Sequence, residues 1–283
     1  MGFIKLVVKK LKILITASIV LYKTDFTELK KNIESIFKEG LDLKLYLVDN
    51  SPADDLKVFT NNDSRIIYIH NPSNPGFGAA HNIAILKAIE KGSKYHFVVN
   101  PDIYFDGKVI SSMVDFMDKD SSIGMMMPQI LNLDGTIQNL PKLLPSPVSI
   151  LLRKLKKPAG IYQKFINRYE LREVGEKVIY NAPILSGCFT LLNLEAIKKI
   201  GVYDDNYFMY FEDWDLSRRI HQHYKTIYFP LVSVYHGYDS GANKSSKLFK
   251  IFLNSSITYF NKWGWIFDSE RKKINKQALS QFQ

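Results

Sequence analysis

The sequence predicts an α/β protein whose central, mostly parallel sheet is flanked by helices and followed by a smaller C-terminal region. Two observations predict this fold. In the first hundred residues, short runs rich in Ile and Val alternate with amphipathic stretches, which is typical of parallel sheets with helices on both faces. Polar, turn-forming residues follow these runs, and such sheets bind ligands beyond the carboxyl ends of their strands.

Length and composition describe an ordinary globular chain with an excess of positive charge. The 283 residues are 46% hydrophobic and 23% charged, which argues against an intrinsically disordered protein. The net charge of +10 suits nucleic acid, an anionic membrane surface or phosphorylated substrates. Nucleic acid is disfavoured, because the basic residues are scattered and no recognition motif appears. Cys188 is the only cysteine, so no internal disulfide can form, which fits a reducing compartment.

The N-terminus joins a basic leader, residues 1–12, to an apolar run, residues 13–22. A run of ten residues is too short to cross a bilayer. We interpret it as a buried strand, and no other stretch is long enough to span a membrane.

The first half repeats strand and helix. We expect strands at 13–22, 43–50, 65–70 and 95–100, and helices at 25–40, 53–60 and 79–92. The segments 48–51, 71–78 and 100–102 follow three of these strands, so they should converge in space.

The second half is less regular. A hairpin is expected over 124–138, around Asp134–Gly135. Residues 141–172 hold eight Lys or Arg against one Glu and predict an exposed basic segment or flap. Further expected elements are a strand at 182–193, helices at 194–201 and 213–224, a strand at 226–230 and a helix at 247–265.

Two of the segments at strand ends have both a structural and a ligand-binding interpretation. Asp49 can cap the following turn, or it can accept hydrogen bonds from a nucleobase or ribose. The loop at 74–78, followed by Asn82, leads into a helix, where free N–H groups suit a diphosphate. Its spacing fits no standard phosphate-binding motif, so alone it favours a plain turn.

Asp102 and His236 are candidate metal ligands. A lone carboxylate beside bound phosphates is a common way to hold Mg²⁺ or Mn²⁺, together with phosphate oxygens and water. His236 could bind a metal or donate to a phosphate, although a lone histidine is more often structural.

Three acids stand within four positions at 212–215, after a run of aromatic residues. Asp213 falls where a helix should begin and can act as its cap, and Asp215 can pair with Arg218 or Arg219 at helical spacing. Capping leaves Glu212 and the aromatic residues unexplained. A carboxylate in an aromatic pocket, kept ionised by a helix N-terminus, suits a general base.

Six stretches in order, from residue 13 to about residue 240, resemble glycosyltransferase family 2, the inverting enzymes with a GT-A fold. They are SIVLYKTD, LVDNSP, NPGFGAAHNIAI, VVNPDI, LSGCFTLLNLEAIKKIGVYDDNYFMYFEDWDLSRRI and VYHGYDSG. The likeness is greatest to bacterial rhamnosyltransferases of O-antigen and capsule assembly. It implies a Rossmann-like GT-A domain over 13–240, with a nucleotide-binding half (13–106) and an acceptor and catalytic half (107–240), then a helical, aromatic-basic extension (241–283).

The resemblance also implies site residues. The nucleotide and donor would be bound by Val20, Leu21, Tyr22, Asp49, Asn50, Asn74, Gly76, Phe77, Gly78, Asn82, Asn100 and Pro101. The acceptor and sugar site would include Gly187, Cys188, Trp214 and Asp215. Asp102 and His236 would hold Mg²⁺ or Mn²⁺. Asp213 would be the catalytic base, with Glu212 beside it. Two positions depart from many relatives: the segment NPD carries one acid where others have two, and Lys23 replaces an Asn.

The function implied is transfer of a sugar from a nucleotide-sugar donor, with dTDP-rhamnose the best candidate, to a saccharide acceptor carried on a polyprenyl diphosphate. UDP-galactofuranose or a UDP-hexose remain alternative donors. The implied location is cytoplasmic. The leader, the 141–172 segment and the aromatic-basic C-terminus either dock on anionic lipid at the inner face of the membrane or form solvated surface.

Two rival functions are weighed against this one. An inactive nucleotide-sugar-binding module is disfavoured by the intact EDWDL and NPD segments. A nucleotidyltransferase would carry a glycine-rich basic loop after its first strand, where this chain has LYKTDFTELKK.

Overall fold

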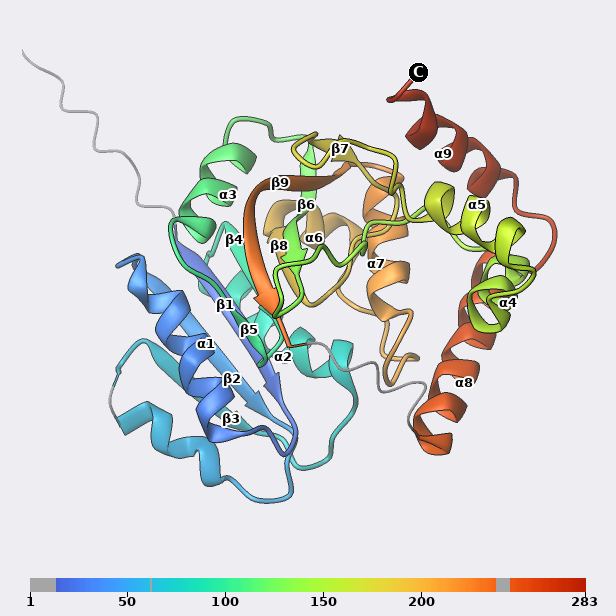
Figure 1. Ribbon diagram of the computed structural model, residues 1–283. Helices are drawn as coiled ribbons and strands as arrows, with labels where there is room; N and C mark the ends of the chain where they lie inside the picture. The colour runs from blue at the N-terminus through green and yellow to red at the C-terminus, as the bar shows by residue number, and fades with distance from the viewer. Residues whose placement is uncertain (1–13, 62, 238–244) are drawn as a thin grey trace, which may run out of the picture.

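In the computed structural model, which describes residues 14–61, 63–237 and 245–283, nine strands form one mixed sheet (Figure 1). Its order is β3-β2-β1-β4-β8-β6-β9-β5, with β7 paired to β9. The strands are β1 (Ile15–Leu21), β2 (Leu43–Asp49), β3 (Ile66–His70), β4 (Tyr95–Val99), β5 (Ile103–Tyr104), β6 (Ile123–Leu131), β7 (Tyr180–Asn181), β8 (Phe189–Asn193) and β9 (Lys225–His236).

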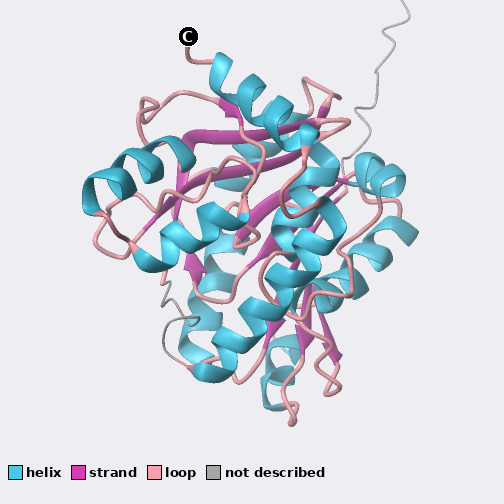
Figure 2. Ribbon diagram, turned by 90° about the vertical axis from the view of Figure 1, so that its right-hand side faces the viewer, coloured by secondary structure: helices cyan, strands magenta, loops and turns pink. Residues whose placement is uncertain are grey.

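The helices lie on both faces of this sheet (Figures 1 and 2). They are α1 (Phe26–Lys38), the 3₁₀ helix η1 (Asp55–Asn61), α2 (Phe77–Glu90), α3 (Val109–Met117), α4 (Pro147–Leu155), α5 (Ala159–Tyr169), α6 (Leu194–Ile200), α7 (Glu212–His221), α8 (Ser246–Trp263) and α9 (Ser269–Ser280). Within the described residues, no helix is long and apolar enough to span a membrane.

The first half matches the predicted alternation of strand and helix. The strands β3, β2, β1 and β4 are all parallel. Since side chains alternate across a strand, Leu45 and Leu47 face the cluster that contains Leu29 of α1, whereas Tyr46 packs with Ala80 of α2. The helices α1 and α2 therefore cover opposite faces.

In the second half the sheet becomes mixed. The strand β8 lies between β4 and β6 and is antiparallel to both, whereas β6 and β9 are parallel. The strand predicted at 182–193 begins only at Phe189, because residues 186–188 form a turn. The predicted hairpin at 124–138 is a turn closed by a single bridge, Leu131 to Ile137, while β6 runs into the sheet.

The segment 141–172 is not a simple exposed flap. It forms α4 and α5, and it buries Lys142 and Tyr169. Arg153 of α4 and Arg172 both pair with the buried Glu170, which ties α4 to the C-terminal end of the segment.

The predicted C-terminal helix is confirmed as α8, and the extension packs closely on the core. Arg218 of α7 makes two hydrogen bonds of 2.8 Å to Asp268, which caps α9 by accepting from the N–H of Arg271. Both Arg218 and Asp268 are buried. The predicted leader, 1–12, lies outside the described residues.

Candidate active site

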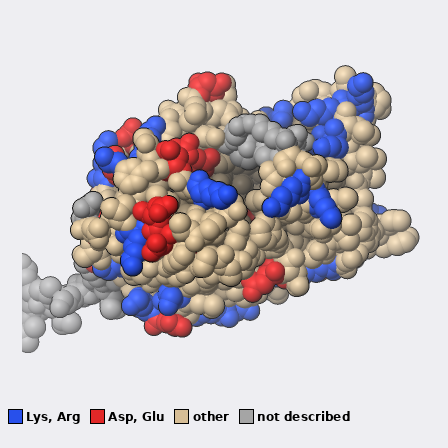
Figure 3. All heavy atoms as spheres, turned by 90° about the horizontal axis from the view of Figure 1, so that it is seen from below, with Lys and Arg blue, Asp and Glu red and all other residues tan. Residues whose placement is uncertain are grey.

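The segments after β2 and β3 meet as predicted, and the end of β1 joins them. That the segment 100–102 converges with them stays a prediction. Asn50, after β2, donates to Asn74 at 3.3 Å and accepts from Asn71 at 2.9 Å, so the two loops are joined. The N–H of Asn50 donates to the carbonyl of Leu21, which links β1 to the same group. Figure 3 looks at the molecule from the side where these strands end.

The β1 residues differ in what they can offer a ligand. Leu21 is fully buried and Val20 packs against the cluster of Tyr46 and Ala80, so neither side chain is free for a nucleotide. The side chain of Tyr22 is exposed. Of these three predicted donor contacts, Tyr22 alone presents a side chain at this edge.

Asp49 has the structural role that was one of its two interpretations. One carboxylate oxygen accepts from the N–H of Ser51 at 2.9 Å, and the other accepts from the hydroxyl of Tyr68 at 2.6 Å. Asp49 is almost fully buried, and its charge together with burial raises the pKa of Tyr68. The geometry supports a capped turn, and contact with a nucleobase stays a prediction.

The glycines of the 74–78 loop allow a close approach of protein to protein. A Cβ on Gly76 would lie 2.1 Å from the carbonyl oxygen of Phe208, and one on Gly78 would lie 2.9 Å from the Cβ of Tyr203. The N–H of Phe77 donates to the same Phe208 carbonyl at 2.9 Å. The start of α2 is thus closed by the segment 203–211 rather than open to a diphosphate.

Asn82 strengthens this contact. Its amide donates to the carbonyl of Tyr203 and to Asp205, each at 2.8 Å, and its oxygen accepts from the N–H of Tyr203 at 3.0 Å. A side chain with these three partners, almost fully buried, positions the segment that leads into α7.

The predicted metal ligands Asp102 and His236 are neighbours. The Nε2 atom of His236 lies 3.5 Å from a carboxylate oxygen of Asp102 and 3.3 Å from the amide nitrogen of Asn100. On its other side, Nδ1 lies 3.1 Å from the oxygen of Gln138, whose amide donates to the carbonyl of His236. Asn100, Pro101 and Asp102 form the turn between β4 and β5, opposite His236 at the end of β9.

Asp213 is the second residue of α7, whereas it was predicted to be the first residue of this helix. The helix begins at Glu212, and Phe211 before it is in the left-handed region with φ of 67°. One Asp213 oxygen accepts from the N–H of Gly187 at 3.1 Å, and the other accepts from the N–H of Trp214 at 2.9 Å. Asp213 is therefore held by backbone donors and is not the helix cap.

Glu212 and Asp213 differ in what keeps them charged or neutral. Burial raises the pKa of Glu212 well above its ordinary value, and the charge of Asp213 raises it further. Burial also raises the pKa of Asp213, but the N–H of Gly187 and the charge of Lys142 oppose that shift. We infer that Glu212 carries the proton of the pair and Asp213 the charge.

The turn at 186–188 connects the two polar groups. Gly187 donates to Asp213, and the carbonyl of Cys188 accepts from the N–H of Asn100 at 2.8 Å. A Cβ on Gly187 would lie 3.3 Å from that of Asp213, so a small residue is needed there. Cys188 is buried, and burial raises the pKa of its thiol to about 12. The pair Asp102 and His236 and the acid Asp213 are thus placed by one turn.

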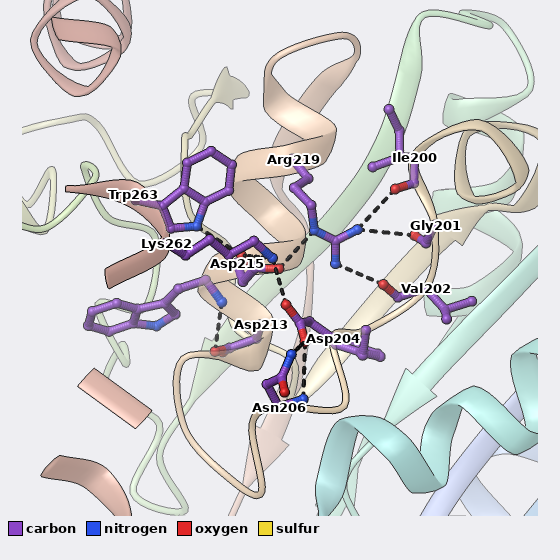
Figure 4. A network of polar contacts seen from close by, with 12 residues as sticks. Ile200, Gly201, Val202, Asp204, Asn206, Asp213, Asp215, Arg219, Lys262 and Trp263 are labelled. Carbon is purple, nitrogen blue, oxygen red and sulfur yellow. Dashed lines mark hydrogen bonds and ion pairs between the residues drawn. The ribbon is translucent and has the colours of Figure 1, made fainter. Parts of the chain in front are cut away.

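Asp215 is a structural residue rather than part of an acceptor site, which corrects its prediction (Figure 4). It is fully buried and binds Arg219 at 2.8 Å, Lys262 at 2.9 Å and the indole N–H of Trp263 at 2.8 Å. Pairing with Arg219 was predicted, whereas Arg218 pairs with Asp268 instead. Since these contacts join α7 to α8, neither carboxylate oxygen is available to a sugar.

Comparison with known proteins assigns the family. A family model described as Glycosyl transferase family 2 matches residues 18–201, which is more than half of the chain. The chain belongs to glycosyltransferase family 2.

Curated relatives of this family 2 glycosyltransferase include two rhamnosyltransferases. The N-acetylglucosaminyl-diphospho-decaprenol L-rhamnosyltransferase of Mycobacterium tuberculosis is 25% identical over 189 residues, which cover 62% of this chain and 61% of that protein. The rhamnosyltransferase WbbL of Escherichia coli is 24% identical over 250 residues, which cover 82% of this chain and 87% of WbbL.

Solved structures share the GT-A fold. The complex of GalNAc-T7 with UDP, GalNAc and Mn²⁺ has a TM-score of 0.61 at 15% identity and covers 89% of this chain and 50% of that one. TarS of S. aureus has a TM-score of 0.58 at 12% identity, and the match covers 95% of this chain and 43% of the TarS chain. At these identities the likeness shows the fold.

The group around Asp102 fits a divalent cation in a family 2 glycosyltransferase. No cluster of three or more His, Cys, Asp or Glu occurs within 14–61, 63–237 and 245–283, so the protein offers one carboxylate and one imidazole. The oxygen of Asn100 is buried and has no hydrogen-bond partner among the described residues. A donor set this small suits Mg²⁺ or Mn²⁺ that takes its remaining ligands from a diphosphate and water. Gln138 orients the imidazole, as is usual for metal-binding histidines.

Lys142 is a site residue that the sequence analysis missed. It is buried, and desolvation, aided by Arg153, lowers its pKa to about 8, although Asp213 and Glu170 favour its charged form. Its amine donates to the carbonyl of Leu140 at 2.7 Å and lies 5.9 Å from the ring centre of Trp214. A lone lysine between apolar residues, in NLPKLLP, was the available signal.

Proposed function

We propose that this enzyme transfers L-rhamnose from dTDP-rhamnose, with inversion, to a saccharide on a polyprenyl diphosphate in surface polysaccharide synthesis. The two rhamnosyltransferase relatives support the sugar, and the decaprenol-linked acceptor named for one of them supports the lipid. We also propose a cytoplasmic location. UDP-galactofuranose or a UDP-hexose would use the same residues, so the donor is the part to be tested first.

The observation that carries the proposal is the placement of Asp213. Its carboxylate is fixed by the N–H of Gly187, and the next residue, Cys188, fixes Asn100 beside Asp102 and His236. A base and a diphosphate-binding group held by one turn are what an inverting transfer requires, because the attacking oxygen and the leaving group lie on opposite sides of one carbon.

In the proposed reaction, Asp213 accepts the proton of the acceptor hydroxyl. The acceptor oxygen bonds to the anomeric carbon from the side opposite the nucleotide, while the bond from that carbon to the diphosphate oxygen breaks. The electron pair of that bond leaves with the nucleoside diphosphate, and the anomeric centre is inverted. Glu212, with its raised pKa, stays protonated and so does not repel the charge on Asp213.

Asp102 and His236 would hold a divalent cation, whose charge balances that of the diphosphate. The exposed side chain of Tyr22 and the joined loops at Asn50 and Asn74 are proposed to contact the nucleoside. Trp214, half-buried beside Asp213, is proposed to contact the acceptor sugar.

The first test is nucleotide release from a donor panel of dTDP-rhamnose, UDP-galactofuranose, UDP-glucose and GDP-mannose, with Mn²⁺, Mg²⁺ or chelator. Asp213→Asn should lower kcat by at least a hundredfold and leave donor binding intact, because the variant lacks a base but keeps the shape. Glu195→Gln, an exposed acid on α6, is the matched control. Near-normal turnover by Asp213→Asn would show that another group is the base. Donor binding by wild type without any turnover would favour the inactive nucleotide-sugar-binding module.

A further inference from the structure

One side of the molecule exposes apolar side chains in two helical stripes. On α4 the exposed residues are Val148, Leu151 and Leu155, which recur at spacings of three and four and so share one face. On α8 they are Phe249, Leu253 and Ile257, at spacings of four. Each stripe points away from the core, which the opposite side of each helix contacts.

The two stripes are neighbours. The amine of Lys154 on α4 lies 4.4 Å from the ring centre of Phe249 on α8, and Ile150 packs against the cluster that contains Phe260. After α8, the loop extends the surface with Ile266 and Phe267, which are 74% and 95% exposed. These segments lie together at the right-hand edge of Figure 1, the side that Figure 2 turns toward the viewer. We call this surface, with Ile161 of α5, the apolar–basic face.

The charge on this face has one sign. The helices α4, α5 and α8 contain no Asp or Glu, so all 28 acids of the chain lie elsewhere. Exposed cations stand on these helices and between α4 and α5; they are Lys154, Lys156, Lys157, Lys164, Arg168, Lys247 and Lys250. Arg153 and Lys262 pair with the buried acids Glu170 and Asp215 instead. In Figure 3 the right-hand part of the molecule shows blue and tan spheres, and the red spheres lie further left.

This combination selects one kind of partner. Apolar side chains bordered by Lys and Arg match the interface of an anionic bilayer, where acyl chains take the apolar groups and headgroups take the cations. A second copy of the chain fits poorly, because a two-fold contact would press one basic face against another.

We propose that the apolar–basic face docks on an anionic lipid bilayer and thereby fixes the orientation of the active site toward a membrane-borne acceptor. The second half of this statement rests on the proposed function, since it assumes a lipid-linked acceptor. Docking itself needs neither donor nor acceptor.

The face is rigidly connected to the catalytic helix. Asp215 of α7 binds Lys262 and Trp263 of α8, and the hydroxyl of Ser255 donates to the carbonyl of Met209 in the loop before α7. The helix that would lie on the lipid therefore positions Asp213 through these contacts, two residues away from Asp215. This connection gives the buried acid Asp215 a structural role beside the proposed base.

The test is flotation of the full chain with vesicles of phosphatidylcholine containing 30 mol % phosphatidylglycerol, or none, at low and high salt. Wild type should bind the anionic vesicles at low salt, and this binding should weaken at high salt. Two variants of the face should each bind anionic vesicles about tenfold or more weakly than wild type. One is the triple variant Leu151→Ser, Leu253→Ser, Phe267→Ser. The other is the double variant Lys156→Glu, Lys157→Glu. The matched controls are Val58→Ser with Leu133→Ser, two exposed apolar residues elsewhere, and Lys57→Glu on η1.

Three results would overturn docking: no binding to anionic vesicles at low salt, losses in the controls equal to those in the face variants, or unchanged vesicle binding of the face variants. In the last case, an altered oligomeric state in light scattering would assign the face to a contact between copies of the chain. Unchanged binding would also assign any membrane affinity to another segment, because the leader is present in every variant. Transfer to a water-soluble acceptor should be the same in the face variants and wild type. Docking and the proposed function can therefore fail independently.

Discussion

At the scale of single residues, the proposed active site contains two adjacent acids that are not equivalent. Glu212 is buried and one of its oxygens finds no hydrogen-bond partner among the described residues, which favours its neutral form. Asp213 receives two backbone N–H groups and faces the charge of Lys142, which favour its ionised form. Buried Lys142, together with the N–H of Gly187, thus increases the ionised fraction of Asp213 that could serve as a base.

Lys142→Met should move the acidic limb of the pH profile of kcat/KM to higher pH. The charge of Lys142 lowers the pKa of Asp213, so its removal raises that pKa and delays ionisation of the base. The profile of initial rates from pH 5 to 9 measures the shift. Lys198→Met, at an exposed position of α6, is the control. An unchanged acidic limb in Lys142→Met would show that Lys142 does not act on the base.

At the scale of elements, the site is assembled where the start of α2 meets the segment before α7. Gly76, Gly78 and Asn82 are all used in that contact, through the carbonyl of Phe208 and the backbone of Tyr203. The loop 74–78 and the start of α2 thus contact the segment that leads into α7, the helix that carries the proposed base.

Gly76→Ala should cost more stability than Gly107→Ala, although both glycines have positive φ, 107° and 82°. At Gly107 a Cβ meets nothing within 4 Å, so only the backbone strain of about 1–2 kcal/mol applies. At Gly76 the Cβ meets the Phe208 carbonyl, which adds about 1–3 kcal/mol for overpacking. Urea denaturation of both variants measures the difference, and equal costs would mean that the segment 203–211 yields without penalty.

Local patterns predicted the first half of the fold well, because the apolar runs and turn residues there act over a few positions. They could not predict that β8 enters the sheet antiparallel, since an apolar run does not identify its partners. Nor could they separate Asp215, fixed to α8, from Asp213, which is two residues away. Lys142 was missed because a lysine is normally solvated, and only the packing of residues far apart in the chain buries it.

At the scale of the whole molecule, the core contains a hydrogen-bonded network of polar side chains that has no part in the proposed reaction. Ser18 lies 2.7 Å from Nε2 of His96 and 2.7 Å from Nδ1 of His81, and Thr16 lies 2.8 Å from Nδ1 of His96. Burial lowers the pKa of His96 to about 3 and that of His81 well below its ordinary value. Both imidazoles are therefore neutral in the folded protein at pH 7.

The buried network of Ser18, His81 and His96 should make the free energy of unfolding depend on pH under acidic conditions. Since the folded pKa of His96 lies below the unfolded value of about 6.5, its contribution is complete above that pH and is lost as pH falls toward 3. The free-energy gap between wild type and His96→Gln should narrow by up to about 1.4 kcal/mol per pH unit below pH 6.5. Urea denaturation at pH 7, 6 and 5 measures it; other titrating groups cancel in the comparison, and a constant gap would contradict the assignment.

The single cysteine has a practical consequence. Cys188 is buried and its thiol keeps its proton at neutral pH, so alkylating reagents should find no reactive sulfur on the folded chain. A cysteine introduced on the surface, at Leu253 for example, would then accept a fluorophore or spin label alone, without removal of the native residue. The depth of such a probe in a bilayer could be read spectroscopically on an otherwise unmodified enzyme.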